Sequence, residues 1–166
     1  MDFNNIDEIK KAKFSGFRKM NELFNGSFPI PKMKGIYLVL NPNYKKAEYL
    51  QIGTGGYFKG KNPNVSLEEL KSNWVDNSLF VYIGKAGNET SKATLNSRLK
   101  QCFGFGQGKN IGHWGGRLIW QLKNANDTQM QHICFCPTHS NHSANSQLFL
   151  KSTHLNAESL LLLRLL

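Results

Sequence analysis

Two short apolar segments constrain the fold of this chain more than any other feature. Residues 35–40 (GIYLVL) and 79–84 (LFVYIG) are apolar at nearly every position, without the alternation of a strand that has one face in water. Such runs are typical of central strands, whose two faces are both covered. We therefore expect a sheet that holds these two segments in its interior.

Helical patterns and turn-forming residues divide the rest of the chain. Residues 5–24 carry apolar side chains at three- and four-residue steps after a start like a capping box, which predicts one amphipathic N-terminal helix. Ser66 and Thr94 are typical helix caps, and the helices that they begin are expected to end near residues 74 and 102. We also expect strands at 48–53 and 131–136, a helix at 115–122, glycine-rich loops at 54–64 and 103–112, a polar loop at 138–146 and an apolar closing helix from 147 onward.

Composition narrows the class of protein. The chain has 166 residues, 40% of them hydrophobic, which suits one domain with a real core. Lys and Arg number 21 against 11 Asp and Glu, and the resulting charge of +10 favours a polyanionic partner, although a merely solubilising surface stays possible. No run of about 18 apolar residues predicts a membrane span, and the polar N-terminus is unlike a signal peptide. We expect a cytoplasmic protein with three reduced cysteines.

Four short sequence elements follow one another along the chain: GIY at 35–37, YIGK at 82–85, Arg98 within LNSRLKQ, and Glu158 within NAESLLLL. Together with GHWGGRLIWQL at 112–122, they give a chain that resembles the GIY-YIG nuclease family from about residue 35 to the end. The resemblance implies an α+β fold, with a small, mostly antiparallel central sheet flanked by helices.

The domain organisation is read from the same resemblance. Residues 1–33 are expected to be an N-terminal helical extension, and residues 34–166 the GIY-YIG-like nuclease domain. The two tripeptides lie closer together in the family, so we place an inserted strand-loop-helix segment at about 41–78. YLQIG at 49–53 is a rival second tripeptide, but no arginine follows it until Arg98, so we prefer 82–84.

The resemblance also implies a reaction, the hydrolysis of a phosphodiester with one divalent metal ion, Mg²⁺ or Mn²⁺, held mainly by Glu158. Tyr37 would activate or orient the attacking water, and Tyr82 would bond a phosphate oxygen or share the proton handling; which tyrosine does which stays open. A phenol has a pKa near 10, so only about 0.1% of it is ionised at pH 7. A cationic neighbour such as Lys85, or the metal, would be needed to make it a base.

Arg98 lies on an apolar helix stripe that ends at Cys102, where relatives often have histidine or tyrosine. Its guanidinium would either reach solvent at the core edge or point into a site against the sheet, pairing there with the non-bridging phosphate oxygens. His113 is a further candidate for proton transfer or phosphate binding. Simpler interpretations also stay open, namely core-filling tyrosines, a helix-start acid at Glu158 and a strand-edge lysine at Lys85.

Basic residues flank the glycine-rich loops and are candidates for salt-dependent contacts with backbone phosphates: Lys59, Lys61, Lys100, Lys109 and Arg117. Tyr57 and Phe58 lie beside two of these lysines in the insertion, where we expect sequence or structure recognition.

A cysteine and histidine cluster lies near the C-terminus: Cys134, Cys136, His139 and His142. Its spacing is not that of a standard zinc finger, so we expect buried thiols and loop histidines rather than a zinc site.

The sequence thus predicts a DNA endonuclease, in a restriction-like, mobile-element or repair setting. The alternatives are a catalytically weak nucleic-acid-binding module of the same fold and an RNA-directed nuclease. DNA is the expected partner, with RNA less favoured and no membrane involved.

Overall fold

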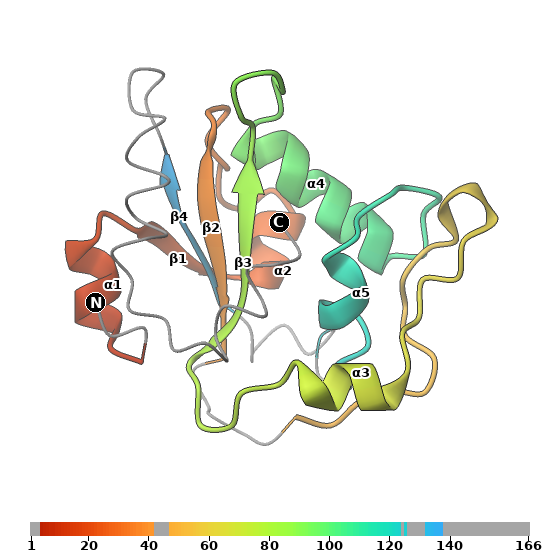
Figure 1. Cartoon of the computed structure of the whole chain (residues 1–166). Coiled ribbons are helices and arrows are strands. Elements are labelled where there is room, and N and C mark those ends of the chain that lie inside the picture. The colour runs from red at the N-terminus through yellow and green to blue at the C-terminus, as the bar shows by residue number, and fades with distance from the viewer. Residues whose placement is uncertain (1–3, 42–46, 124, 126–131, 138–166) are drawn as a thin grey trace.

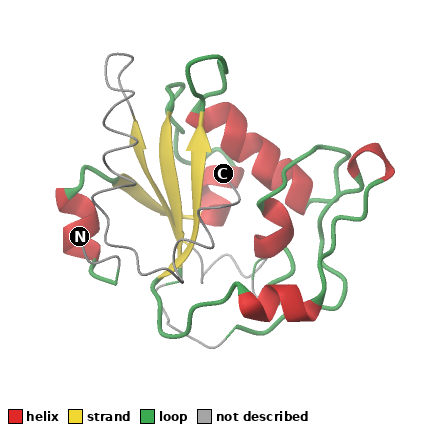
Figure 2. Cartoon of the chain, viewed as in Figure 1, coloured by secondary structure: helices red, strands yellow, loops and turns green. Residues whose placement is uncertain are grey.

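The computed structural model of this chain describes residues 4–41, 47–123, 125 and 132–137. Four strands form one sheet in the order β1-β4-β2-β3, and every neighbouring pair is antiparallel. The strands are β1 (Ser15–Lys19), β2 (Gly35–Leu40), β3 (Phe80–Ala86) and β4 (His132–Pro137). The helices are α1 (Ile6–Lys11), α2 (Met20–Phe24), α3 (Leu67–Ser72), α4 (Leu95–Gly106) and α5 (Gly116–Ile119), with a short 3₁₀ helix at Phe58–Gly60. The predicted α+β class, with a small antiparallel sheet flanked by helices, is confirmed (Figure 2).

The central position predicted for the first apolar segment is also confirmed. All six residues of β2 are buried, because β3 and β4 pair along its two edges and both faces of the sheet are covered. Its even-numbered residues pack in one core cluster with Ile9 of α1. Tyr37 and Val39 project to the other face, into a cluster with residues of α2, α4 and α5. Figure 1 shows α1 on one side of the sheet and these three helices on the other.

The prediction of one continuous helix over residues 5–24 is wrong. Lys13 and Gly16 adopt positive φ angles of 70° and 75°, which a right-handed helix does not contain. Between α1 and α2 the chain forms β1, which pairs with β4 at the edge of the sheet. The ring of Phe135 covers Gly16 so closely that no side chain would fit there. The segment predicted as a helical extension therefore supplies a strand of the main sheet.

The strand predicted over residues 48–53 is reduced to one isolated bridge, between Tyr49 and Leu122. The amide groups of Leu50 and Thr54 donate to carbonyls of the turn after α5, over 2.8 and 3.1 Å. This stretch of chain therefore runs beside that turn, outside the sheet. Helix α5 itself ends at Ile119, short of the predicted end at residue 122.

Helix α4 begins where predicted but extends further. The Thr94 hydroxyl accepts the Ser97 N–H at 3.2 Å, and the Ser97 hydroxyl accepts the Thr94 N–H at 2.9 Å, so the two residues cap the helix reciprocally. The helix continues through Gly106, although its glycines predict a loop from residue 103. A side chain at Gly106 would collide with the ring of Trp120. Glycine is needed here for close packing of a neighbouring segment and not for a turn.

Candidate active site

The tyrosines of the two tripeptides lie side by side on neighbouring strands. Tyr37 of β2 pairs with Gly84 of β3, and Val39 pairs with Tyr82, so both tyrosines project from the same face of the sheet. Their ring centroids are 6.0 Å apart, and their hydroxyls share a hydrogen bond. Tyr37 is 0% exposed and Tyr82 is 4% exposed. Only Tyr82 thus has any surface in contact with solvent.

Two glycines make room for this pair. The ring of Tyr37 lies over Gly84, the glycine of YIG, where a Cβ atom would overlap the ring. The hydroxyl of Tyr82 lies against Gly115, where a Cβ atom would overlap the hydroxyl. Gly84 therefore has a packing role, because the ring of Tyr37 on the neighbouring strand leaves no room for a Cβ atom.

His113 completes a buried polar cluster. Its Nδ1 accepts the backbone N–H of Gly116 at 2.8 Å, which assigns the proton of the neutral ring to Nε2. That Nε2 lies 3.5 Å from the Tyr37 hydroxyl, a long contact in which the imidazole is the donor. Burial, with the charge of Arg98 as a second cause, lowers the pKa of His113 to about 3. The ring is therefore neutral at physiological pH.

Burial governs the protonation of the two hydroxyls in this cluster. Burial raises the pKa of Tyr37 well above its usual value, and the bond to Tyr82 raises it further. Burial also raises the pKa of Tyr82 to about 12, but here the bond to Tyr37 acts in the lowering direction. Both hydroxyls therefore stay protonated at neutral pH, and the Tyr37 proton, whose oxygen lies against the His113 Nε2–H, is available for the bond to Tyr82. The three side chains thus form one hydrogen-bonded cluster, from His113 through Tyr37 to Tyr82.

Arg98 of α4 lies half-buried beside this cluster. After the larger effect of burial, its positive charge acts to lower the pKa of Tyr37, Tyr82 and His113 alike. Its guanidinium donates to the side chain of Gln101 at 3.4 Å, and no carboxylate among the described residues forms a salt bridge with it. A cation without a carboxylate partner, next to three buried polar rings, suits a bound anion.

The structure does not bring Lys85 into this cluster. Side chains alternate along β3, with Tyr82 and Ala86 in the core cluster of one face and Ile83 in that of the other. Lys85 is exposed and follows the alternation to the face of Ile83, opposite the tyrosines. Lys85 therefore cannot be the cation that activates the tyrosines. Among the described residues, the charge of Arg98 is the one that lowers the pKa of both tyrosines. Cys102, four residues after that arginine, is 1% exposed, and burial raises the pKa of its thiol to about 12, so it fills the core.

The described residues do not by themselves fit a metal ion. No group of three His, Cys, Asp or Glu side chains gathers in the described part of the chain. Hydroxyl, imidazole and guanidinium groups surround the tyrosines, whereas Mg²⁺ and Mn²⁺ prefer carboxylate and other oxygen ligands. The predicted ligand Glu158 lies outside the described residues. So do His139 and His142 of the zinc alternative.

The two cysteines of β4 lie in the core and at its edge. Cys134 is buried, and Cys136 lies half-buried on the same face. Burial raises the pKa of Cys134 to about 12, so this thiol is protonated at neutral pH. All three cysteines of the chain are free.

The predicted phosphate-binding residues divide into two groups. Four of them are exposed: Lys59, Lys61, Lys100 and Lys109. Arg117 is half-buried, and its guanidinium donates to the carbonyls of Pro63 and Asn64 at 3.4 and 3.0 Å. This arginine holds the segment before α3 against α5, so part of its hydrogen-bonding capacity serves the fold.

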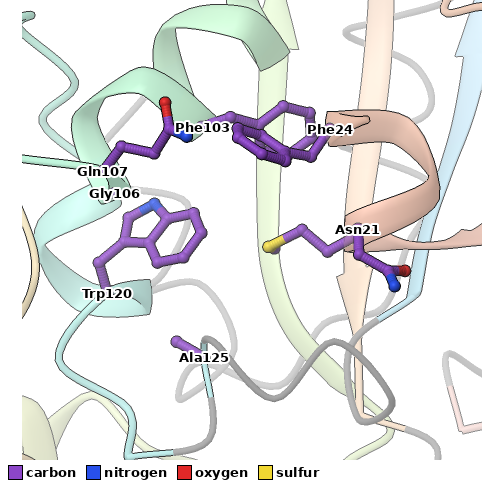
Figure 3. A pocket seen from close by; sticks show the side chains of 8 residues that line it. Asn21, Phe24, Phe103, Gly106, Gln107, Trp120 and Ala125 are labelled. Carbon is purple, nitrogen blue, oxygen red and sulfur yellow. The ribbon is translucent and has the colours of Figure 1, made fainter. Parts of the chain in front are cut away.

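A separate cavity of about 230 Å³ opens between α2, α4 and the turn after α5 (Figure 3). Its walls are mostly apolar and include Phe24, Phe103 and Trp120. None of the residues predicted for catalysis or for phosphate binding lines it. The cavity is therefore distinct from the tyrosine cluster.

Sequence reasoning missed two parts of the site, Gly115 and the backbone N–H of Gly116. Both belong to the HWGG stretch, which carried a signal in its adjacent glycines. Their role depends on close approach to Tyr82 and to the ring of His113, which sequence spacing does not reveal.

No helix in the described residues combines the length and apolarity required to cross a membrane. Comparisons of the chain with models of protein families, with curated proteins and with solved structures found no match.

Proposed function

We propose that this chain is a GIY-YIG-type endonuclease that hydrolyses phosphodiester bonds of DNA with the help of a divalent metal ion. One observation carries the proposal. The tyrosines of two tripeptides that lie far apart in the sequence share a hydrogen bond, with His113 behind them and the charge of Arg98 beside them. A chain charge of +10 supports a polyanionic substrate.

In the proposed reaction, water attacks phosphorus, its hydroxyl stays on the phosphate, and its proton ends on the leaving sugar oxygen. Negative charge builds on the non-bridging oxygens during this step, and the fork of Arg98 suits their geometry. Tyr82 would donate its O–H proton to one of these oxygens. The hydrogen bonds that link His113, Tyr37 and Tyr82 would hold the Tyr82 hydroxyl in place.

This assignment refines the roles expected of the tyrosines. Burial raises the pKa of both hydroxyls, so neither favours the ionised form that a general base requires. Tyr37, fully buried, would act on Tyr82 and not on water directly. A metal ion bound by Glu158 and substrate oxygens would neutralise charge at the phosphate. The described residues gather no metal-binding group of their own around the tyrosines.

A second candidate is a nucleic-acid-binding module of the same fold without catalysis. The near-complete burial of Tyr37 and Tyr82 favours it, since tyrosines that only fill a core would be buried in the same way.

Incubation of supercoiled plasmid with the protein and Mg²⁺ separates the two candidates. The wild type should nick the plasmid in Mg²⁺ and not in EDTA, and Arg98→Ala and Glu158→Ala should bind it but cut it poorly. If all three proteins bind plasmid equally and leave it intact, the binding module is the better account. A parallel incubation with structured RNA tests the RNA-directed alternative, which preferential RNA cleavage would support.

A further inference from the structure

Three aromatic side chains that are not part of the tyrosine cluster are exposed: Tyr57, Phe58 and Trp114. Tyr57 and Trp114 are each 58% exposed and Phe58 is 38% exposed, although large aromatic side chains usually bury most of their surface. Among the described residues, Phe24 is the one other aromatic side chain with comparable exposure. Such a concentration of exposed rings marks a binding surface more often than a folding feature.

Packing between two distant chain segments brings together the stretches of backbone that carry these rings. The ring of Phe58 lies on the backbone of Gly112, two residues before Trp114. The backbone of Gly56 lies directly against the carbonyl of Lys109 and donates its N–H to the carbonyl of Phe105 at 2.9 Å. The two segments therefore form one platform in the folded protein, beside α5 (Figure 1).

Arg117 links the same platform to the segment before α3. Its guanidinium lies 4.3 Å from the ring centroid of Trp114 while it donates to the Pro63 and Asn64 carbonyls. The indole is thus held by stacking on a side chain that is itself anchored. A ring fixed before binding loses less entropy when a ligand stacks on it.

The two stretches of sequence that contain the platform carry charge of one sign. Residues 49–67 and 90–126 contain eight Lys and Arg and no Asp or Glu, although the whole chain has eleven acidic residues. Lys59, Lys61 and Lys109 are exposed within these two ranges, and the Lys59 ammonium lies 5.3 Å from the ring centroid of Phe58. Exposed rings interspersed with cations suit a ligand that carries both flat π-faces and anionic charge.

We propose that this aromatic–basic surface (Tyr57, Phe58, Trp114, Lys59, Lys61 and Lys109) binds an unpaired stretch of nucleic acid. Bases of an intact duplex already stack on one another, so only unpaired bases can offer their faces to exposed rings. The lysines meet the phosphates between those bases. This inference rests on the proposed function for the identity of the ligand and deepens it. The substrate class becomes DNA with a single-stranded segment, such as a flap, a gap or a melted end.

Fluorescence anisotropy tests the proposal directly, with a labelled single strand of about ten nucleotides, within the usual site size, and a blunt duplex of the same sequence. EDTA is present, so that binding is measured without cleavage. Tyr57→Ala and Trp114→Ala should each weaken single-strand binding about 5- to 150-fold, the range that loss of one stacked base implies. Tyr57→Phe and Trp114→Phe keep a ring and should bind nearly as the wild type does.

Ile52→Ala is the matched control, because Ile52 is 73% exposed in the same segment but has no ring. It should leave single-strand affinity unchanged. Lys59→Ala and Lys61→Ala should each make the dependence of log K on log salt shallower by about 0.7, the value for one phosphate contact on a single strand. Because Tyr57 is mostly exposed, Tyr57→Ala keeps the test decisive if Trp114→Ala fails to fold.

Three results would overturn the proposal: unchanged single-strand affinity in both ring-to-alanine variants, a duplex bound more tightly than the single strand, or an equal loss in Ile52→Ala. Unchanged affinity would assign the rings to another partner, such as a protein. Cleavage of plasmid and of a flap duplex in Mg²⁺, with Arg98→Ala beside the wild type, reports separately on the proposed function. Ring-dependent binding without cleavage of either substrate would leave the surface valid and refute the nuclease, and cleavage with ring-independent binding would do the reverse.

Discussion

Acidification should destabilise this fold through His113. The ring is 2% exposed, and its Nδ1 accepts a backbone N–H, so the folded state holds the neutral form. Burial, aided by the charge of Arg98, lowers the pKa of His113 to about 3, whereas an unfolded histidine titrates near 6.5. Between these values the unfolded state binds a proton that the folded state does not. The loss of stability therefore begins as the pH falls below 6.5 and grows by about 1.4 kcal/mol per pH unit.

At pH 5 this single group should lower the free energy of unfolding by about 2 kcal/mol relative to pH 7. Urea denaturation of the wild type and of His113→Gln at both pH values measures the effect, and the other four histidines are common to both proteins. The wild type should lose about 2 kcal/mol more than the variant on going from pH 7 to pH 5. Equal losses in the two proteins, or an NMR titration of the His113 ring with an ordinary pKa near 6.5, would refute the reasoning.

Two further predictions concern buried contacts, one of packing and one of hydrogen bonding. Gly115→Ala should lower the free energy of unfolding by about 1–3 kcal/mol in urea denaturation, because its methyl group would overlap the hydroxyl of Tyr82; a variant as stable as the wild type would contradict this contact. Gln121→Leu should cost about 1–3 kcal/mol or more, since the Gln121 side chain accepts the buried Val65 N–H at 2.7 Å and donates back to its carbonyl at 3.1 Å. In thermal melts Lys123→Ala, which breaks only an exposed ion pair, should stay close to the wild type, and an equal effect of the two changes would contradict the role of Gln121.

Local signals predicted much of the fold. The apolar runs predicted β2 and β3, and Ser66 caps the start of α3, since its hydroxyl accepts the Glu69 N–H at 3.1 Å. The N-terminal segment misled because its apolar spacing fits a helix, while β1 depends on pairing with β4 from the far end of the chain. Tertiary pairing of this kind overrides a local period, and the single-sequence pattern carries no trace of it.

The candidate site was predictable in part. Both tyrosines, Arg98 and His113 lie together, although the tyrosines are 45 residues apart in the sequence. The placement of Lys85 on the opposite face could have been derived, since residues three apart on a regular strand face opposite ways. The depth of burial of the tyrosines could not, because it depends on how α4 and α5 cover the sheet.

The rate of DNA cleavage under single-turnover conditions in Mg²⁺ tests the central claim most directly. If Arg98 stabilises the charge that develops on the phosphate, Arg98→Ala should cleave about 10²- to 10³-fold more slowly than the wild type while keeping its fold. Arg18→Ala is the matched control, because Arg18 lies on β1, at the opposite edge of the sheet from β3, and should cleave at the wild-type rate. A wild type that cleaves no DNA in Mg²⁺, or an Arg98→Ala variant as fast as the wild type, would contradict the account.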